Sequence, residues 1–299
     1  MLALGGGALW MMRERLVFPQ PTITAQGGDP DSGWLPFASR RQPVVTVQAK
    51  VNGVSTRALV DSGAQHSVID SGFAEQMEAG GGLSAPVIAY GVGGSPQMGK
   101  TLSVDLELGG LRLQGLRAAS LDLGPIAEAN HLDTPLVLGQ DLLRALAADI
   151  DFPGRRIRFV RSQSFTVPEG ARLAPVRARG RALEARVMVE GVELEAIVDT
   201  GASAALSLAS DVAEAAGLLD GRRVQPGQAI VLGGVAPGRI VRASHLTFAG
   251  LVREDVPVHI FEPQNLPGFP RGLLGYDALR PFRVIMDHRG GAMHLIGGE

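Results

Sequence analysis

The sequence predicts an all-β protein built from two similar lobes, and two observations carry this prediction. The chain of 299 residues contains 40 glycines and 19 prolines but few long helical patterns, which is typical of many short strands joined by turns. In addition, a series of motifs in the first half returns in the same order in the second half. A chain of this length can bury a core in each of two domains.

The repeat is clearest around two acidic motifs. Asp-Ser-Gly-Ala at residues 61–64 matches Asp-Thr-Gly-Ala at 199–202, and segments 51–54 and 189–192 precede them at the same spacing. The further matching pairs are 93–94 with 233–234, 108–111 with 248–251, 136–142 with 272–278, and 151–154 with 287–290. Because the order is kept and the spacing drifts by only a few residues, a whole domain-sized unit is duplicated.

Alternating apolar residues predict the strands of each repeat. Residues 45–51 and 183–189 place an apolar side chain at every second position, which is the period of a half-buried strand. The pairs Asn-Gly at 52–53 and Glu-Gly at 190–191 then suit the tight turns of β-hairpins. Residues 102–108 alternate in the same way and predict a further strand.

Only short helices are expected between these strands. We predict them at residues 71–79 and 210–218, the second with Ser210 as its N-cap. Asp141 and Asp277 recur between the repeats ahead of helix-like residues, and we interpret both as helix N-terminal caps. Neither helix changes the fold class.

The start of the chain is set apart from the repeat. Residues 1–12 are uncharged but too few to span a bilayer, and Arg13 and Arg15 follow them rather than precede them. Two alternatives stand: an exported protein, periplasmic or membrane-anchored, that carries the remnant of a signal or anchor, or a cytoplasmic protein with a frayed N-terminus. Residues 19–33 have the composition of a linker. We divide the chain into an N-terminal apolar segment and linker (1–34), a first lobe (35–165) and a second lobe (166–299).

The residues beside the two acids favour a close approach of the repeats. Each acid follows an apolar strand, so its carboxylate stands in a loop at the end of a rigid sheet. Gly63 and Gly201 lack a Cβ and therefore allow another chain segment to come close. Ser62 and Thr200 can hydrogen-bond across a pseudo-twofold axis and hold the two loops together.

Two carboxyls held this close have a specific chemistry. Asp61 and Asp199 cannot both ionise, so the pair keeps one proton at a pH where isolated acids are charged. The ionised member can deprotonate a water molecule while the protonated member hydrogen-bonds a scissile carbonyl. We therefore predict that Asp61 and Asp199 are the catalytic residues.

These motifs resemble those of retropepsin-like aspartic proteases. The resemblance rests on the two acidic motifs and on the apolar-apolar-Gly segments at 137–139 and 273–275, and it covers the chain from about Leu35. It implies two β-barrel lobes related by pseudo-twofold symmetry, in which those segments support the catalytic loops. The implied activity is that of an aspartic endopeptidase without cofactor or metal.

The resemblance also implies a substrate and a pH range. Ala64 and Ala202 follow the retropepsin pattern, which implies a milder pH optimum than that of a gastric enzyme. A protein or peptide should lie extended between the lobes. Because both halves of the site are in one chain, we expect a monomer.

The family closes glycine-rich hairpins, called flaps, over its substrate, and two segments of this chain lie at corresponding places. Tyr90, at the first of them, either brings a phenolic hydroxyl to the site or fills space as a strand-end aromatic. The flap glycines that we expect to border the substrate are Gly91, Gly93, Gly94, Gly233 and Gly234.

Two other functions remain open. A retropepsin-like fold can serve as a catalytically silent module that binds proteins or peptides. Residues 94–101 also match the phosphate-binding P-loop pattern, with Lys100 and Thr101 in the expected places. A P-loop needs a helix after it, whereas the following residues alternate like a strand, so a nucleotide binder is the remote alternative.

Composition excludes several other classes. A formal net charge of −2 gives no electrostatic footprint for nucleic acid, and the absence of cysteine excludes thiol catalysis and disulfides. The six histidines show no metal-binding spacing. His66, five residues after the first acid, is interpreted as a solvated loop histidine at the border of the site.

Overall fold

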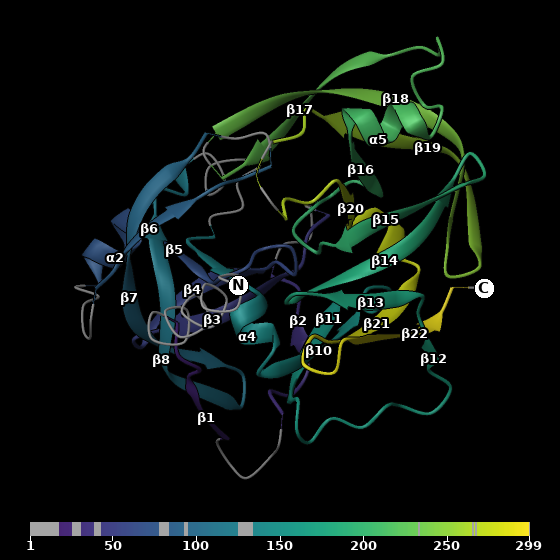
Figure 1. Ribbon diagram of the computed structural model, residues 1–299. Helices are drawn as coiled ribbons and strands as arrows, with labels where there is room; N and C mark the ends of the chain where they lie inside the picture. The colour runs from purple at the N-terminus through teal and green to yellow at the C-terminus, as the bar shows by residue number, and fades with distance from the viewer. Residues whose placement is uncertain are drawn as a thin grey trace, which may run out of the picture.

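The computed structural model describes residues 18–25, 31–38, 43–77, 84–92, 95–124, 134–232, 234–264, 266 and 268–298. Most of these residues lie in β-strands, which form two lobes and a third sheet between them (Figure 1). The first lobe runs from purple to teal and holds the first acidic motif, and the second, teal through green to yellow, holds the other. The predicted all-β, two-lobe architecture is confirmed.

The first lobe is a closed barrel. Its strand β7 pairs with both β8 and β3, so the ring of strands has no free edge within it. In order around the barrel the strands are β3 (Thr46–Val51), β4 (Val54–Val60), β9 (Leu136–Leu138), β5 (Val68–Asp70), β8 (Leu111–Leu121) and β7 (Gln97–Leu108).

The second lobe repeats this order of strands. Its ring is joined by a short pairing of β14 with β18, and β13 (Val176–Arg179) extends the sheet at β14. The strands are β14 (Ala182–Val189), β15 (Val192–Val198), β20 (Gly272–Leu274), β16 (Leu206–Ala209), β19 (Leu251–Phe261) and β18 (Gly234–Phe248). The sequence repeat is therefore also a repeat of topology.

Each barrel begins, in chain order, with a β-hairpin, and the two hairpins correspond in the repeat. Asn52 and Gly53 have φ of 48° and 84°, and Glu190 and Gly191 have φ of 50° and 80°. Two successive residues with positive φ make the type of tight turn that matches the twist of paired strands. The β3–β4 and β14–β15 hairpins thus confirm the predicted turns.

The helices are short, and one predicted cap is wrong. Helix α2 (Ser71–Gln76) is capped by Asp70, whose Oδ1 accepts from Phe73 N at 3.0 Å. Helix α5 (Ser210–Ala215) begins after Ala209 and has no side-chain cap. Because Ser210 lies one residue inside the helix, its hydroxyl donates to Glu262 at 2.9 Å instead. Helices α4 (Gln140–Leu143) and α6 (Tyr276–Leu279) occupy matching places in the two lobes.

A third sheet joins the lobes. The pairing of β10 with β21 carries backbone hydrogen bonds from one repeat to the other, with Ile150 opposite Val284. The order across this sheet is β12 (Arg172–Leu173), β22 (Ala292–Gly297), β21 (Phe282–Asp287), β10 (Leu146–Asp151), β11 (Arg156–Arg161) and β2 (Leu35–Pro36). The lobes therefore fold on a shared base.

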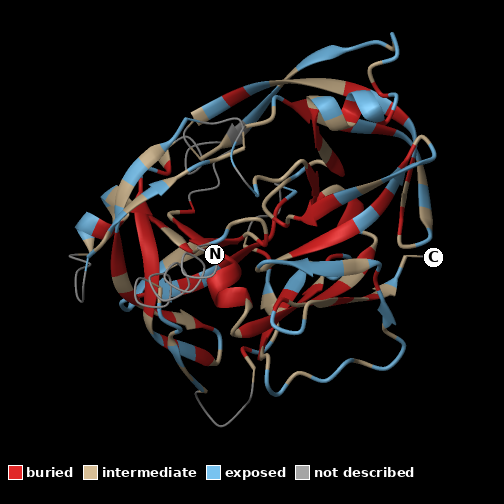
Figure 2. Ribbon diagram, viewed as in Figure 1, coloured by how far each residue is buried: buried red, intermediate tan, exposed pale blue. Residues whose placement is uncertain are grey.

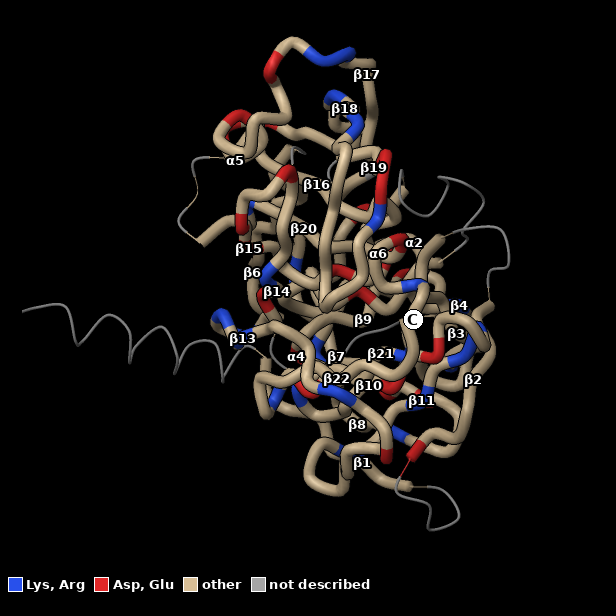
Figure 3. Tube along the Cα trace, turned by 90° about the vertical axis from the view of Figure 1, so that its right-hand side faces the viewer, with Lys and Arg blue, Asp and Glu red and all other residues tan. Residues whose placement is uncertain are grey.

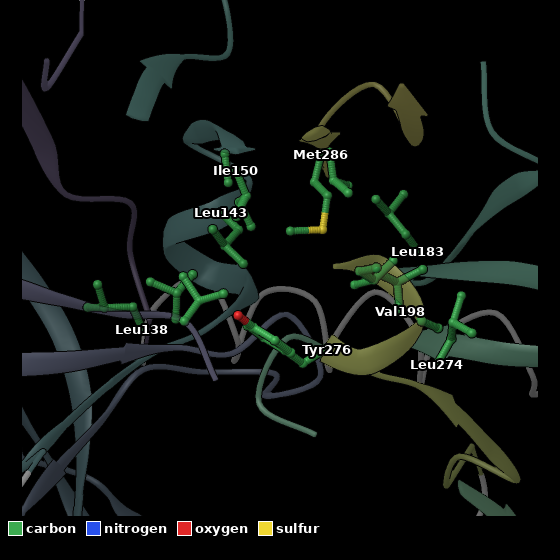
Figure 4. Packing of buried hydrophobic residues seen from close by; sticks show 14 of the residues in the cluster. Leu138, Leu143, Ile150, Leu183, Val198, Leu274, Tyr276 and Met286 are labelled. Carbon is green, nitrogen blue, oxygen red and sulfur yellow. The ribbon is translucent and has the colours of Figure 1, made fainter. Parts of the chain in front are cut away.

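The hydrophobic core is continuous between the lobes. Figure 2 shows buried residues on the inner strands of both lobes, whereas the long outer hairpins are largely exposed or intermediate. Figure 4 shows Leu143 and Ile150 of the first repeat facing Met286 of the second, with Tyr276 lying between the two groups. The ring of Tyr276 also packs edge-on against Phe152 at 5.1 Å between centroids.

A buried ion cluster reinforces this junction. Asp149 on β10 is fully buried and accepts hydrogen bonds from Arg158 Nη2 at 2.8 Å and from Arg283 Nε and Nη2 at 2.8 and 2.7 Å. Both guanidinium groups also face the ring of Trp34. Figure 3 shows both acidic and basic residues in the region of β10, β11 and β21. Since Arg283 comes from the second repeat, this cluster holds the lobes together.

The described residues before the first lobe pack against it, although their composition suggests a linker. Strand β1 (Thr22–Ala25) pairs with β8, and Ser32 is buried, with its Oγ accepting from Phe159 N at 2.9 Å. The apolar segment at residues 1–12 lies outside the described residues. None of the helices that the structure describes is both long and apolar enough to cross a membrane.

Candidate active site

The two acidic loops leave the barrels at equivalent points. Asp61 follows β4 and Asp199 follows β15, and each of these strands pairs in parallel with the supporting strand of its lobe. Asp61 N donates to Leu138 O at 3.0 Å, and Asp199 N donates to Leu274 O at 2.9 Å. The backbone of each acid is thus fixed by the segment that precedes Gly139 or Gly275.

Backbone amides orient both carboxylates. Asp61 Oδ1 accepts from Gly63 N at 2.9 Å and from Ala64 N at 3.0 Å. In the other loop, Asp199 Oδ1 accepts from Gly201 N at 2.9 Å and from Ala202 N at 3.2 Å. A side-chain hydrogen bond joins the two acids themselves. The loops therefore present two carboxyls to each other in nearly equivalent settings.

Each glycine leaves room for the opposite acid. A Cβ on Gly63 would lie 2.6 Å from Asp199 Cγ, and a Cβ on Gly201 would lie 2.6 Å from Asp61 Cγ. Both distances are far shorter than any van der Waals contact, so only glycine permits this approach. Each carboxyl therefore lies against the glycine of the other loop and also faces the other carboxyl.

The two hydroxyls cross between the loops. Thr200 Oγ1 donates to Val60 O at 2.6 Å and accepts from Ser62 N at 3.1 Å. Ser62 Oγ donates to Val198 O at 2.7 Å and accepts from Thr200 N at 3.0 Å. Both side chains are fully buried. These four bonds satisfy backbone groups of both lobes at once and fix the separation of the acids.

Burial controls the ionisation of the pair. It raises the pKa of Asp61, against the opposing effects of the hydrogen bonds from Asp199 and the loop amides. Burial also raises the pKa of Asp199, well above its ordinary value, and the negative charge of Asp61 raises it further. The two groups titrate as a unit, and this unit holds on to a proton where a solvated carboxyl would lose it.

The comparison with protein families agrees with this geometry. The model of the aspartyl protease family matches residues 47–142 and again residues 185–278, which together make up more than half of the chain. The chain belongs to the aspartyl protease family. Each of the two matches contains one of the paired acids, as the retropepsin-like resemblance implied. No curated protein sequence matches the chain.

One polar residue distinguishes the first acidic loop of this chain from the second. Gln140 on α4 is buried, and its Nε2 donates to Ser62 O at 2.8 Å and to Gly63 O at 3.5 Å. Tyr276 takes its place in the second lobe. The sequence analysis missed this contact, although the mismatch of Gln140 with Tyr276, between the matching glycine and aspartate of each repeat, was a signal for it.

The interpretation of Asp141 and Asp277 as helix caps is wrong. The cap positions of α4 and α6 are glycines without side-chain bonds. Asp141 Oδ1 instead accepts from Ser67 N at 3.0 Å and Ser67 Oγ at 2.8 Å, which ties α4 to the loop beyond the first acid. Burial raises the pKa of Asp141. Asp277 forms ion pairs, 2.7 Å from Arg253 and 2.8 Å from Arg280.

Long hairpins stand at the places where the resemblance implies flaps. They are formed by β6 (Pro86–Ala89) with β7 and by β17 (Gln225–Val231) with β18. Gly91 lies against the second hairpin, since a Cβ on it would fall 2.8 Å from Leu232 N. Gln264 Nε2 donates to Gly91 O at 3.0 Å. Leu232 packs against an apolar cluster of the first lobe that consists of Val44, Leu59, Leu123 and Val137.

The predicted flap residues lie partly within the described part of the chain. Gly93, Gly94 and Gly233 lie outside the described residues, and Gly234 begins β18 with φ of 122°. Tyr90 is 44% exposed, so it does not act as a space-filling aromatic.

The P-loop alternative lacks its structural context. Lys100 and Thr101 lie inside strand β7, whereas a phosphate-binding loop requires a helix at this point. Thr101 is buried, and its Oγ1 accepts from Ala85 N at 3.0 Å within the first barrel. The segment is therefore part of the flap hairpin and of the barrel wall.

Thr200→Val tests the crossed hydroxyls. Valine has a similar shape but leaves Val60 O and Ser62 N buried without their partner, which costs about 1–3 kcal/mol for each group. We expect the free energy of unfolding, measured by urea denaturation, to fall by about 2–6 kcal/mol. Thr24→Val is the matched control, because Thr24 Oγ1 reaches Arg112 O at 3.4 Å at an exposed site. Equal small effects in both variants would show that the crossed bonds do not hold the loops.

Proposed function

We propose that this protein is an aspartic endopeptidase that hydrolyses peptide bonds of a protein substrate with a water molecule activated by Asp61 and Asp199. The observation that carries the proposal is the pair of hydrogen-bonded, half-buried carboxyls, each oriented by two amides and facing the glycine of the other loop. Membership of the aspartyl protease family supports the same reaction.

The mechanism needs one proton on the pair. The ionised carboxyl accepts a proton from water as the water oxygen bonds to the scissile carbonyl carbon, while the other carboxyl donates its proton to the carbonyl oxygen. The tetrahedral intermediate, now a neutral diol, then collapses and the C–N bond breaks. The carboxyl that took the water proton gives it to the leaving nitrogen, while the other carboxylate takes a proton from a hydroxyl of the intermediate as the new C=O bond forms. The site returns to its starting state with one proton on the pair.

The substrate in this proposal is an extended polypeptide. Strands of the two long hairpins offer backbone groups with which such a chain can pair. One chain supplies both acids, so a monomer suffices, and the residues that we assign to the reaction are carboxyls that need no cofactor or metal. A silent binding module is the alternative, but both acids, both hydroxyls and both glycines are in place.

A peptide library provides the test. We expect the protein to cleave a subset of its members at internal bonds, with products identified by mass spectrometry and with the same rate in the presence of a metal chelator. If library members bind to the protein but remain uncut between pH 3 and pH 8, a binding module is the correct function and the peptidase proposal fails.

A further inference from the structure

An aromatic side chain from the start of the described chain lies beside the first acidic loop. The ring of Phe18 stacks on the imidazole of His66, with centroids 3.8 Å apart and planes 20° from parallel. His66 is thus half-buried rather than a solvated loop histidine, because Phe18 covers it. Burial, together with the charge of Arg181, lowers the pKa of His66 to about 4.

The backbone places His66 in the loop that carries the first acid. A Cβ on Gly139 would lie 2.9 Å from Ala64 O and 2.7 Å from His66 O, so both residues of the loop lie against this glycine. Ala64 packs against the same apolar cluster as Leu232 of the second flap hairpin, and its N donates to Asp61 Oδ1 at 3.0 Å. His66, two residues further along the same loop, therefore lies close to both the first acid and the second flap hairpin.

The second lobe carries a small side chain at the position equivalent to His66. The equivalent loop has the same backbone path, since a Cβ on Gly275 would lie 2.5 Å from Ala202 O and 2.3 Å from Ala204 O. Ala204 takes the position of His66 in the repeat. The two sides of the site therefore differ: the first lobe offers an imidazole face to a neighbouring side chain, and the second offers a methyl group.

Phe18 is held near His66 by residues 18–25, a segment anchored to the first lobe that we call the strap. Strand β1 pairs with β8, Arg161 Nη2 donates to Ile23 O at 3.0 Å, and the side chain of Ile23 packs against the core. Pro19 and Pro21 lie between this strand and Phe18, and proline restricts the backbone of such a connection. The strap thus presents Phe18 to His66 at a low entropic cost.

We propose that His66 forms one wall of a subsite for an aromatic side chain of the substrate, and that Phe18 occupies this subsite as an intramolecular competitor. The inference rests on the proposed function and names the substrate class: polypeptides with an aromatic residue near the cleaved bond, on the side of the first lobe. Such substrates displace Phe18, whereas others meet a partly blocked site.

Kinetics of Phe18→Ala measure the competition. Stacking of an aromatic pair changes an equilibrium by a factor of about 2–10. We expect KM for a peptide with phenylalanine at this position to fall by about that factor in Phe18→Ala, while kcat stays the same. In a His66→Ala background the effect of Phe18→Ala should disappear, because the wall of the subsite is gone. Phe165→Ala, which removes a ring tilted over His294, is the control and should leave KM unchanged.

A spectroscopic test separates this proposal from the peptidase reaction. In the parent, the ring current of Phe18 should shift the NMR signal of the His66 imidazole, and Phe18→Ala should remove the shift. A peptide that copies residues 16–21 should restore it in that variant, and the same peptide with alanine for phenylalanine should not. Identical His66 signals in parent and Phe18→Ala would overturn the subsite even if the protein cleaves peptides. The expected shifts without any cleavage would leave the subsite standing and reject the peptidase.

Discussion

Asp61→Asn and Asp199→Asn should each lower kcat/KM for peptide cleavage by at least about 10³-fold, since general acid–base catalysis contributes about 10²–10⁴ and the pair acts as a unit. An amide neither takes a proton from water nor donates the carboxyl proton to a carbonyl oxygen. The asparagine carbonyl can still accept the two loop amides that Oδ1 accepts, so the loop geometry is retained. Cleavage rates within about threefold of the parent in either variant would reject the mechanism.

The same variants have an expected effect on stability that serves as a control for folding. Because burial raises the pKa of Asp199 above 3.8, the folded state holds a proton that the unfolded state releases. This contribution is complete below pH 3.8 and is lost as the pH rises through the raised pKa. At pH 7, Asp199→Asn should therefore melt above the parent, and the difference should vanish in acid. A variant that melts well below the parent would make its lost activity uninformative.

Asp149→Ala should lower the free energy of unfolding by about 3–5 kcal/mol, the usual cost of breaking a buried ion pair from one side. The change leaves two guanidinium groups beside each other without the carboxylate that both of them bind. The damage falls on the β10–β21 junction, so we expect the two lobes to separate at lower urea concentration than in the parent.

Glu107→Ala is the matched control for Asp149→Ala. Glu107 lies 3.5 Å from Lys50 in an exposed pair, and such pairs contribute about 0–1 kcal/mol. A change of less than about 1 kcal/mol in Asp149→Ala, similar to that of the control, would show that the cluster does not hold the lobes together.

The features that the sequence predicted depend on neighbours in the chain. The Asn-Gly pair at residues 52–53 needs positive φ at both positions, and the period of two in residues 45–51 decides which side chains face the core. The duplication also allowed a long-range prediction. Two equal loops at the ends of equal strands imply a twofold arrangement in which Asp61 and Asp199 meet.

The features that the sequence did not predict depend on partners brought together by folding. Asp141 precedes helix-like residues as a cap would, yet its partner is Ser67, which only the packing of α4 against the loop reveals. Gln140 likewise finds carbonyls in a loop far back in the chain. The stacking of Phe18 on His66 joins a residue from ahead of the first lobe to the first acidic loop, and no periodicity encodes such a contact.

The pH dependence of kcat/KM for a cleaved peptide tests most directly whether Asp61 and Asp199 share one proton. Activity requires the singly protonated pair, so the profile should be bell-shaped. Burial raises the pKa of both groups above 3.8, so the acidic limb should lie above that value and the optimum should be mildly acidic or near neutral. A rate that rises steadily into alkaline solution would contradict the shared proton, and one confined to strong acid would contradict the raised pKa of both groups.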